Sequence, residues 1–393
     1  MDSLIDKVCQ ESKTTTGRAG AIVISWKDKG TKDITRHYFE HPVWQMKWGD
    51  PVPDMPLDVQ LELINACSLS CTACPVHQQN RPTSLLTWDV LQSIVNQSAE
   101  GGVCYFTICG VGEASLHPDL FRLLRLIRSK NVAITGMRRV PMLPSVLISN
   151  GVWTDAQVAE CIENPPDLLS LSLAGLTQQE IEDRRRPINL EQFYETVKRL
   201  HGSRRLVRDI DGGISPIIHI STHIYPHEID SRADDIQRFK EKWFEVCDAV
   251  VIKPTMLGPH HQDFCQYLDG PLPDRKTPSP LKYNNISKKH FERTAPCMET
   301  SRRLSVDSDG NVWCGHNLSE YMGSCLGNVY KQGLREIWHG ETMNGFRRGV
   351  RAGVFNHATC KLCGGEIRET VRVLPVCLED DISFGGWGSH GLR

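Results

Sequence analysis

A chain of 393 residues is longer than one minimal domain and has room for a large domain beside a smaller one. Its 45 Lys and Arg residues against 47 Asp and Glu residues leave a net charge of -2, so no basic field is available to hold nucleic acid or an anionic membrane surface. No apolar segment approaches the roughly 20 residues of a membrane helix, and the first residues lack the apolar core of a signal peptide. We therefore expect a cytoplasmic protein that acts on a small partner, with neither nucleic acid nor a membrane as a partner.

The predicted elements begin with an N-terminal extension, residues 1–56, in which residues 21–25 and 35–40 are candidate strands. From residue 57 onward, strand-like runs alternate with amphipathic helical segments such as residues 87–99 and 118–129. The six predicted strands are residues 57–64, 103–108, 145–149, 168–173, 215–224 and 249–253. This alternation predicts an α/β fold, a partial (β/α)6 TIM-like barrel over residues 57–257, with its chemistry at the carboxyl ends of the strands.

The remainder of the chain divides by composition. Residues 258–295 are rich in turn-forming residues and are interpreted as a linker. Residues 296–377 form a cysteine-rich C-terminal module, and residues 378–393 a tail.

The 15 cysteines are unevenly spaced. Cytosolic thiols stay reduced, so tight cysteine clusters indicate metal or redox chemistry rather than a disulfide framework. One set is Cys67, Cys71 and Cys74, and the other is Cys297, Cys314, Cys325, Cys360, Cys363 and Cys377. The first set follows the first predicted strand directly, so its thiolates project from one loop at the mouth of the barrel. Three thiolates can hold three irons of a four-iron cluster and leave the fourth open to a ligand; a zinc site completed by His77 is the alternative.

This C-x3-C-x2-C spacing resembles the signature of the radical S-adenosylmethionine superfamily. The segments ICGVGEASLHPDL, LISNG and LSLSLAG resemble further landmarks of that family, although Ala73 and Ala114 stand where an aromatic residue and a proline are usual. The resemblance implies an enzyme that cleaves S-adenosylmethionine reductively to a 5′-deoxyadenosyl radical. It implies that a glutamate receives the methionyl ammonium, a serine approaches the ribose and an arginine meets the carboxylate. The implied cofactor-binding residues are Gly110, Gly112, Glu113, Ser149, Asn150, Ser172, Arg185 and Arg186.

The segment SPIIHISTHIY has a period of two, so its isoleucines are expected to face the helices and its polar residues the lumen. The candidate catalytic residues are His219, His223, Tyr225 and Lys253. The alternative is that these side chains only fill a polar lumen.

The C-terminal module resembles the SPASM and the shorter twitch auxiliary domains of the same superfamily. Residues 307–310 are a predicted hairpin turn that brings Val306 and Val312 onto paired strands. By this resemblance Cys297, Cys314, Cys360 and Cys363 ligate one auxiliary 4Fe-4S cluster. A structural zinc site is the alternative, and Cys325 and Cys377 are left as further ligands, hydrogen-atom donors or buried thiols.

The auxiliary cluster favours dehydrogenation or epimerisation of a small polar substrate such as a sugar or aminocyclitol, with electrons from an external flavodoxin- or ferredoxin-type reductant. Maturation of a ribosomally made peptide by crosslinking or epimerisation is the competing hypothesis; the N-terminal extension looks short for the winged-helix element that such enzymes often carry. A non-catalytic iron–sulfur or zinc protein is the alternative of another class. It does not explain the residues that resemble a cofactor-binding rim.

Overall fold

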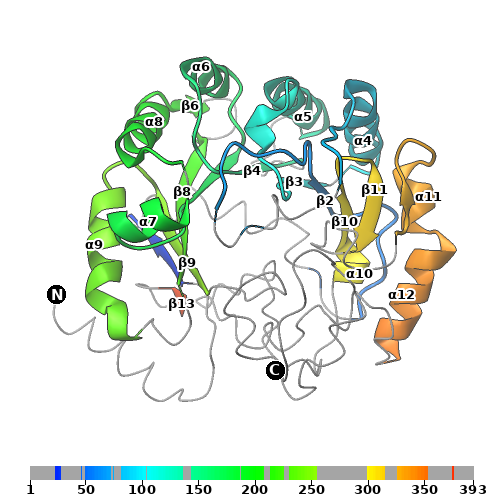
Figure 1. Cartoon of the computed structure of the whole chain (residues 1–393). Helices are drawn as coiled ribbons and strands as arrows, with labels where there is room; N and C mark the ends of the chain where they lie inside the picture. Colours follow the sequence, from blue (N-terminus) through cyan, green and yellow to red (C-terminus); the bar gives the residue numbers. More distant parts are fainter. Residues whose placement is uncertain are drawn as a thin grey trace.

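The computed structural model describes residues 23–27, 46, 49–71, 74, 81–102, 104–135, 143–185, 187–207, 213–224, 230–254, 299–314, 325–352 and 374–375. Six parallel strands pair in chain order within this part, as predicted. They are β2 (Asp58–Leu61), β3 (Tyr105–Ile108), β4 (Ser145–Ser149), β5 (Leu168–Ser172), β8 (Ile217–Ile224) and β9 (Ala249–Pro254). The curved α/β sheet confirms the predicted fold class (Figure 1).

Helices lie in an arc outside this sheet (Figure 1). They are α4 (Trp88–Glu100), α5 (Leu120–Thr135), α6 (Asp155–Glu163), α8 (Leu190–Gly202) and α9 (Ala233–Trp243), with α7 (Gln178–Arg184) and the short 3-10 segments η2 (Ala114–Leu116) and η4 (Asp230–Arg232) in the connections. Thr154 and Thr177 begin α6 and α7 with reciprocal side-chain and backbone hydrogen bonds that satisfy exposed N–H groups. Thr87 occupies the corresponding position of α4, but its side chain makes no capping hydrogen bond.

The alternation of side chains along the strands separates two apolar clusters. Val59, Leu61, Phe106 and Ile108 are fully buried in the main core between sheet and helices, where each large aliphatic side chain contributes about 1.5–3 kcal/mol by leaving water. The opposite, inner face carries a smaller cluster of Tyr105, Val146, Leu168 and Ile217 at the amino ends of the strands. The isoleucines Ile218, Ile220 and Ile224 lie in the main core, as the sequence pattern predicts.

The C-terminal module continues the barrel sheet. Strand β10 (Arg303–Val306) pairs in parallel with β2, and β11 (Asn311–Cys314) pairs antiparallel with β10, with Val306 opposite Val312 as predicted. Arg303 donates to Asp58 across the β10–β2 junction, where both side chains are buried. Strand β12 (Gly327–Asn328) follows β11 at this edge of the sheet.

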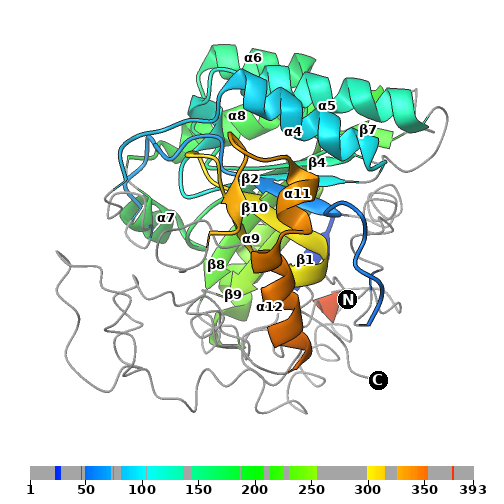
Figure 2. The same cartoon turned by 90° about the vertical axis from the view of Figure 1, so that its right-hand side faces the viewer.

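Three helices accompany this hairpin: α10 (Glu299–Arg302), α11 (Leu334–Trp338) and α12 (Glu341–Arg351), of which α11 and α12 lie beside it in Figure 2. At the opposite edge of the sheet, β1 (Val23–Trp26) pairs antiparallel with β9, and β13 (Leu374–Pro375) pairs with β1. Strands β6 (Arg205–Val207) and β7 (Gly213–Ser215) form a separate pair. None of the helices in the described ranges is long and apolar enough to span a bilayer.

The strand predicted at residues 35–40, the linker and the tail lie outside the described residues, and the predicted domain limits stay a prediction. The predicted strand at residues 21–25 corresponds to β1, which joins the barrel sheet through β9.

Candidate functional site

The cysteine loop, residues 66–81, leaves the sheet at the end of β2 and is closed at its base. The side-chain amide of Asn65 donates to the Pro82 carbonyl oxygen at 2.8 Å, and the Ser84 N–H donates to Asn65 Oδ1 at 2.8 Å. An antiparallel bridge between Ile64 and Leu85 continues this closure. Both ends of the loop are thus fixed to the barrel.

Two glycines bring the turn after β3 against this loop. A Cβ atom on Gly112 would lie 2.1 Å from the Ile64 carbonyl oxygen, and one on Gly110 would lie 2.4 Å from the Glu62 side chain. The Glu113 N–H donates to the Ala66 carbonyl oxygen at 2.8 Å. Only glycine permits this approach, which places the Gly-x-Gly-Glu segment beside the first residues of the cysteine loop.

The Glu113 carboxylate joins the turns that follow β3 and β4. Its Oε1 accepts hydrogen bonds from the Ser149 hydroxyl at 2.7 Å and the Ser115 N–H at 3.1 Å, and its Oε2 accepts one from the Asn150 N–H at 2.7 Å. The side chain is buried. A carboxylate here therefore fixes the positions of two predicted cofactor-binding turns and places a negative charge between them.

Asn150 connects this carboxylate to the first cysteine. Its side-chain amide donates to Cys67 Sγ at 3.7 Å, and its Oδ1 accepts from the Val152 N–H at 2.8 Å. The Leu69 N–H also points to Cys67 Sγ, at 3.4 Å. Gly151 has a φ of +70°, the left-handed conformation that glycine adopts without strain. The turn after β4 thus directs an amide donor at a sulfur atom.

Arg185 enters the same network from the end of α7. Its Nη2 donates to the Asn150 carbonyl oxygen at 3.3 Å, and its side chain also contacts Cys71. Burial lowers the pKa of Arg185, while the charges of Cys71, Glu113 and Cys67 oppose that shift. Its Nη1 is buried and has no hydrogen-bond partner within the described ranges. A buried, unpaired guanidinium nitrogen next to thiols fits an anionic group such as a carboxylate or a thiolate-bound cluster.

The three thiols of the cysteine loop suit the four-iron cluster that their spacing predicts. Cys67, Cys71 and Cys74 form no disulfide, and burial raises the pKa of the Cys67 thiol. No three His, Cys, Asp or Glu side chains of the described chain converge on one metal ion, but each thiolate of a four-iron cluster binds a different iron. Cys67, Cys71 and Cys74 would hold the cluster, Glu113 and Arg185 would bind the ammonium and carboxylate of S-adenosylmethionine, and the two cofactors together would supply a carbon-centred radical.

The inner face of the sheet is polar towards the carboxyl ends of the strands. Ser172 and Ser221 lie in register with their hydroxyl oxygens 3.3 Å apart, and His223 pairs in register with Lys253 at the end of β9. His219 lies four residues earlier on β8, about 13 Å towards the amino end, where its ring packs edge-on against Trp26 at a centroid distance of 5.5 Å.

Several predicted residues have no described position. Tyr225, Arg186, Cys297, Cys360, Cys363 and Cys377 lie outside the described residues. Of the second cysteine set, Cys314 ends β11, and Cys325 is exposed with its thiol donating to the Gly327 carbonyl oxygen at 3.0 Å.

One carboxylate that the sequence analysis missed connects the barrel with the C-terminal module. The buried Glu62 carboxylate accepts from Arg81 Nη2 at 2.9 Å, from the Val111 N–H at 2.9 Å and from the Ser308 N–H at 3.2 Å. Arg81 also reaches Asp309 at 3.4 Å. The end of the cysteine loop is therefore attached to the turn of the C-terminal hairpin. Glu62 directly follows β2 and continues the polar side of its alternation, but no local pattern revealed its distant partners.

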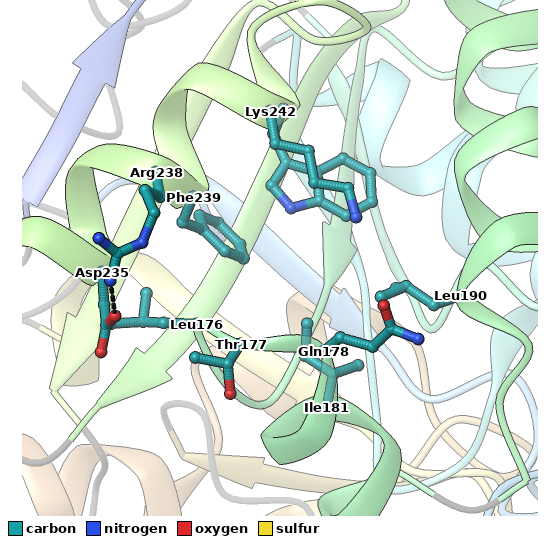
Figure 3. Close-up of a pocket in the computed structure, with 10 residues that line it drawn as sticks. Leu176, Thr177, Gln178, Ile181, Leu190, Asp235, Arg238, Phe239 and Lys242 are labelled. Atoms are coloured by element: carbon teal, nitrogen blue, oxygen red, sulfur yellow. Dashed lines mark hydrogen bonds and ion pairs between the residues drawn. The ribbon is translucent and has the colours of Figure 1, made fainter.

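A cavity of about 250 Å³ lies elsewhere, among α7, α8 and α9 (Figure 3). Its apolar lining comes from Leu176, Ile181, Leu190, Phe239 and Trp243, with Arg238 and Lys242 among its charged residues. None of the predicted site residues lines it, so it belongs to the helical layer rather than to the candidate site.

Comparisons with protein families give two matches. The sequence model of the radical SAM superfamily matches residues 61–239, and that of an iron–sulfur cluster-binding domain, SPASM, matches residues 297–364. The chain therefore combines a radical SAM domain with a C-terminal SPASM domain. Its cofactors are 4Fe-4S clusters and S-adenosylmethionine, as the sequence analysis predicted.

Several solved structures are similar to this chain at low sequence identity. The structure of anSMEcpe with bound AdoMet is 16% identical, with 74% of this chain and 79% of that chain covered at a TM-score of 0.50. BtrN in complex with AdoMet and 2-DOIA is 13% identical, with 78% and 92% covered at 0.44. Streptococcus suis SuiB bound to S-adenosylmethionine is 13% identical, with 84% and 77% covered at 0.49. A search of curated proteins gives no match.

Proposed function

We propose that this enzyme cleaves S-adenosylmethionine reductively to a 5′-deoxyadenosyl radical, which abstracts hydrogen from a small polar substrate held on the inner face of the barrel. The observation that carries this proposal is the hydrogen-bonded group of Cys67, Glu113, Asn150 and Arg185. It combines thiol ligands, a carboxylate and an incompletely paired guanidinium at one edge of a parallel sheet. The charges of the carboxylate and the guanidinium are complementary to those of the amino and carboxylate groups of S-adenosylmethionine.

The substrate class follows from the inner face. Ser172, Ser221 and His223 offer hydroxyl and imidazole groups to hydroxyl or amino groups of a ligand, and the backbone of Lys253 lies in register with His223. His223, at the carboxyl end of β8, is a better candidate for substrate contact than His219, which packs against Trp26.

The preferred reaction is dehydrogenation of a carbinol, with epimerisation as the related outcome. In dehydrogenation the carbon-bound hydrogen atom goes to the 5′-deoxyadenosyl radical, the hydroxyl proton goes to a base and one electron goes to the auxiliary 4Fe-4S cluster. His223 is the proposed base, since a neutral imidazole accepts a proton near pH 7. Cys314, with Cys297, Cys360 and Cys363, is the proposed ligand set of the auxiliary cluster.

An external flavodoxin- or ferredoxin-type protein is the proposed one-electron donor, in the cytoplasm. The net charge of -2 supports the proposal that nucleic acid is not a partner.

The test uses anaerobically reconstituted enzyme, reductant and S-adenosylmethionine with extract from cells grown in deuterated medium. The extract is separated into small-molecule and peptide fractions, and Cys67→Ala enzyme serves as the control. We expect deuterated 5′-deoxyadenosine with the small-molecule fraction, together with a product that has lost two hydrogen atoms or has inverted one centre. Deuterium transfer only from the peptide fraction would instead establish maturation of a ribosomal peptide and reject the small-substrate proposal.

A further inference from the structure

The auxiliary module contains a buried arginine whose role is unassigned. Arg347 lies on α12, which packs against α10, and Figure 2 shows α12 beside the module that contains β10 and β11. The residue is only 6% exposed. Burying a guanidinium costs several kcal/mol unless its N–H groups and its charge find partners.

Most of the Arg347 side chain is rigidly held. Nε donates to the Thr300 carbonyl oxygen at 2.9 Å, and Nη1 donates to the Trp338 carbonyl oxygen at 2.7 Å and to Asn344 Oδ1 at 2.9 Å. The guanidinium carbon lies 4.2 Å from the centre of a Trp338 ring. These contacts fix the plane of the guanidinium group.

The remaining nitrogen, Nη2, is buried and has no hydrogen-bond partner in the described part of the chain. Cys314, which ends β11, is close enough to Arg347 to interact with it electrostatically. Burial lowers the pKa of Arg347 to about 10, and the negative charge of the Cys314 thiolate opposes this shift. The same combination, an unpartnered buried guanidinium nitrogen near a cysteine, occurs at Arg185 beside the first cysteine set.

We propose that Arg347 is a positioning residue for the auxiliary cluster, to which its Nη2 donates a hydrogen bond, and that its charge stabilises the reduced form of that cluster. Reduction adds one electron and hence one negative charge, which a fixed cation in a medium of low dielectric stabilises. The residue thereby helps the cluster to accept the electron that the substrate radical loses. This inference rests on the proposed role of Cys314 as a cluster ligand.

The first test compares Arg347→Gln with Arg348→Gln, a control at the next position of the same helix. Arg348 has a side chain that is 64% exposed and pairs with Glu341. The auxiliary cluster is titrated at poised potentials and followed by electron paramagnetic resonance, with S-adenosylmethionine added to distinguish the first cluster. We expect the reduced-to-oxidised ratio at a fixed potential to fall roughly tenfold in Arg347→Gln, which is about 59 mV for one electron. Arg348→Gln should stay within about twofold of wild type.

A second measurement covers the case in which Arg347→Gln fails to fold. Enzyme labelled with 15N in arginine is examined by pulsed electron paramagnetic resonance of the reduced auxiliary cluster, and Arg347→Lys, which keeps the charge and much of the packing, is compared with wild type. A 15N coupling present in wild type and lost in Arg347→Lys supports the inference. Its absence from wild type, or its persistence in Arg347→Lys, overturns the inference, as does an unchanged potential in folded Arg347→Gln.

The Cys314→Ala variant distinguishes failure of the inference on Arg347 from failure of the proposed ligand set. If the folded variant keeps the auxiliary signal unchanged, Cys314 is not a ligand, and the ligand assignment fails together with the inference. If the signal is lost or altered in Cys314→Ala while the Arg347 variants behave as wild type, only the inference fails.

Discussion

Replacing Glu113 should damage both the architecture of the site and cofactor binding. Glu113→Ala removes the acceptor for the Ser149 hydroxyl and for the N–H groups of Ser115 and Asn150, at distances of 2.7 to 3.1 Å. Hydrogen bonds to a charged group contribute about 1.5–3 kcal/mol each, and part of that loss is recovered where water enters. We expect the free energy of unfolding to fall by about 3–4 kcal/mol. The affinity for S-adenosylmethionine should fall tenfold to a hundredfold, as estimated for one lost charge-assisted bond.

The assay combines urea denaturation of the apoprotein with anaerobic titration of S-adenosylmethionine into the reconstituted enzyme. Glu113→Gln keeps the volume of the side chain but turns an NH2 group towards at least one of the three donors, so its stability should lie between those of wild type and Glu113→Ala. Glu160→Ala, an exposed substitution on α6, is the control and should match wild type within about 0.5 kcal/mol. Wild-type stability and affinity in Glu113→Ala would falsify the assignment of this carboxylate.

Three further substitutions test other parts of the structure. Gly112→Ala places a Cβ 2.1 Å from a backbone carbonyl oxygen, so it should distort the cysteine loop and halve the iron content; a full complement of iron would contradict this. Asp58→Asn removes one of the two buried carboxylates that pair with Arg303 and leaves Glu299 as the other, so urea denaturation should show a loss of roughly 1.5–3 kcal/mol, whereas a change below about 0.5 kcal/mol would reject the pair as a structural element. Burial raises the pKa of Glu180, but Arg232 and two backbone N–H groups together lower it from 4.5 to about 2. Wild-type stability should therefore decline by roughly 1–2 kcal/mol as pH falls from about 4.5 towards 2; Glu180→Gln should lack this decline, and parallel pH curves for the two proteins would refute the assignment.

The barrel could be predicted because its signals are local. Each of the six strands is a short aliphatic run bounded by turn residues, and alternation along residues 217–224 assigned the isoleucines correctly to the helix-facing side. The hairpin of β10 and β11 followed from a turn only a few residues long. The predicted strand at residues 57–64 is shorter in the structure, Asp58–Leu61, because the chain after Leu61 leaves the parallel sheet for the base of the cysteine loop.

The pairing of β10 with β2 could not be predicted in the same way. Arg303 and Asp58 are 245 residues apart, and neither residue carries a local pattern that specifies its partner. The same limit applies to Arg81, whose partners are Glu62, directly after β2, and Asp309 in the C-terminal hairpin.

Within the candidate site, motif spacing identified Cys67, Glu113 and Asn150, which the structure brings together. The distinction between Arg184 and Arg185 required packing information, and Arg186 lies outside the described residues. Arg185 turns into the site, whereas Arg184 donates to the Ala174 carbonyl oxygen and pairs with Glu180. Sequence periodicity treated His219 and His223 alike because both lie on the inner face of β8. Strand β1, which lies beyond β9 in the sheet and brings Trp26 against His219, distinguishes them.

The most direct test of the central claim is the formation of 5′-deoxyadenosine by anaerobically reconstituted protein with dithionite and S-adenosylmethionine. Wild-type protein should form it, and Cys67→Ala should form none, because that change removes a ligand of the cluster that injects the electron. Cys161→Ala, which removes a buried thiol on α6, should retain the activity if it folds. Absence of 5′-deoxyadenosine from wild-type protein that carries about eight iron atoms, or equal amounts from wild type and Cys67→Ala, would contradict the account.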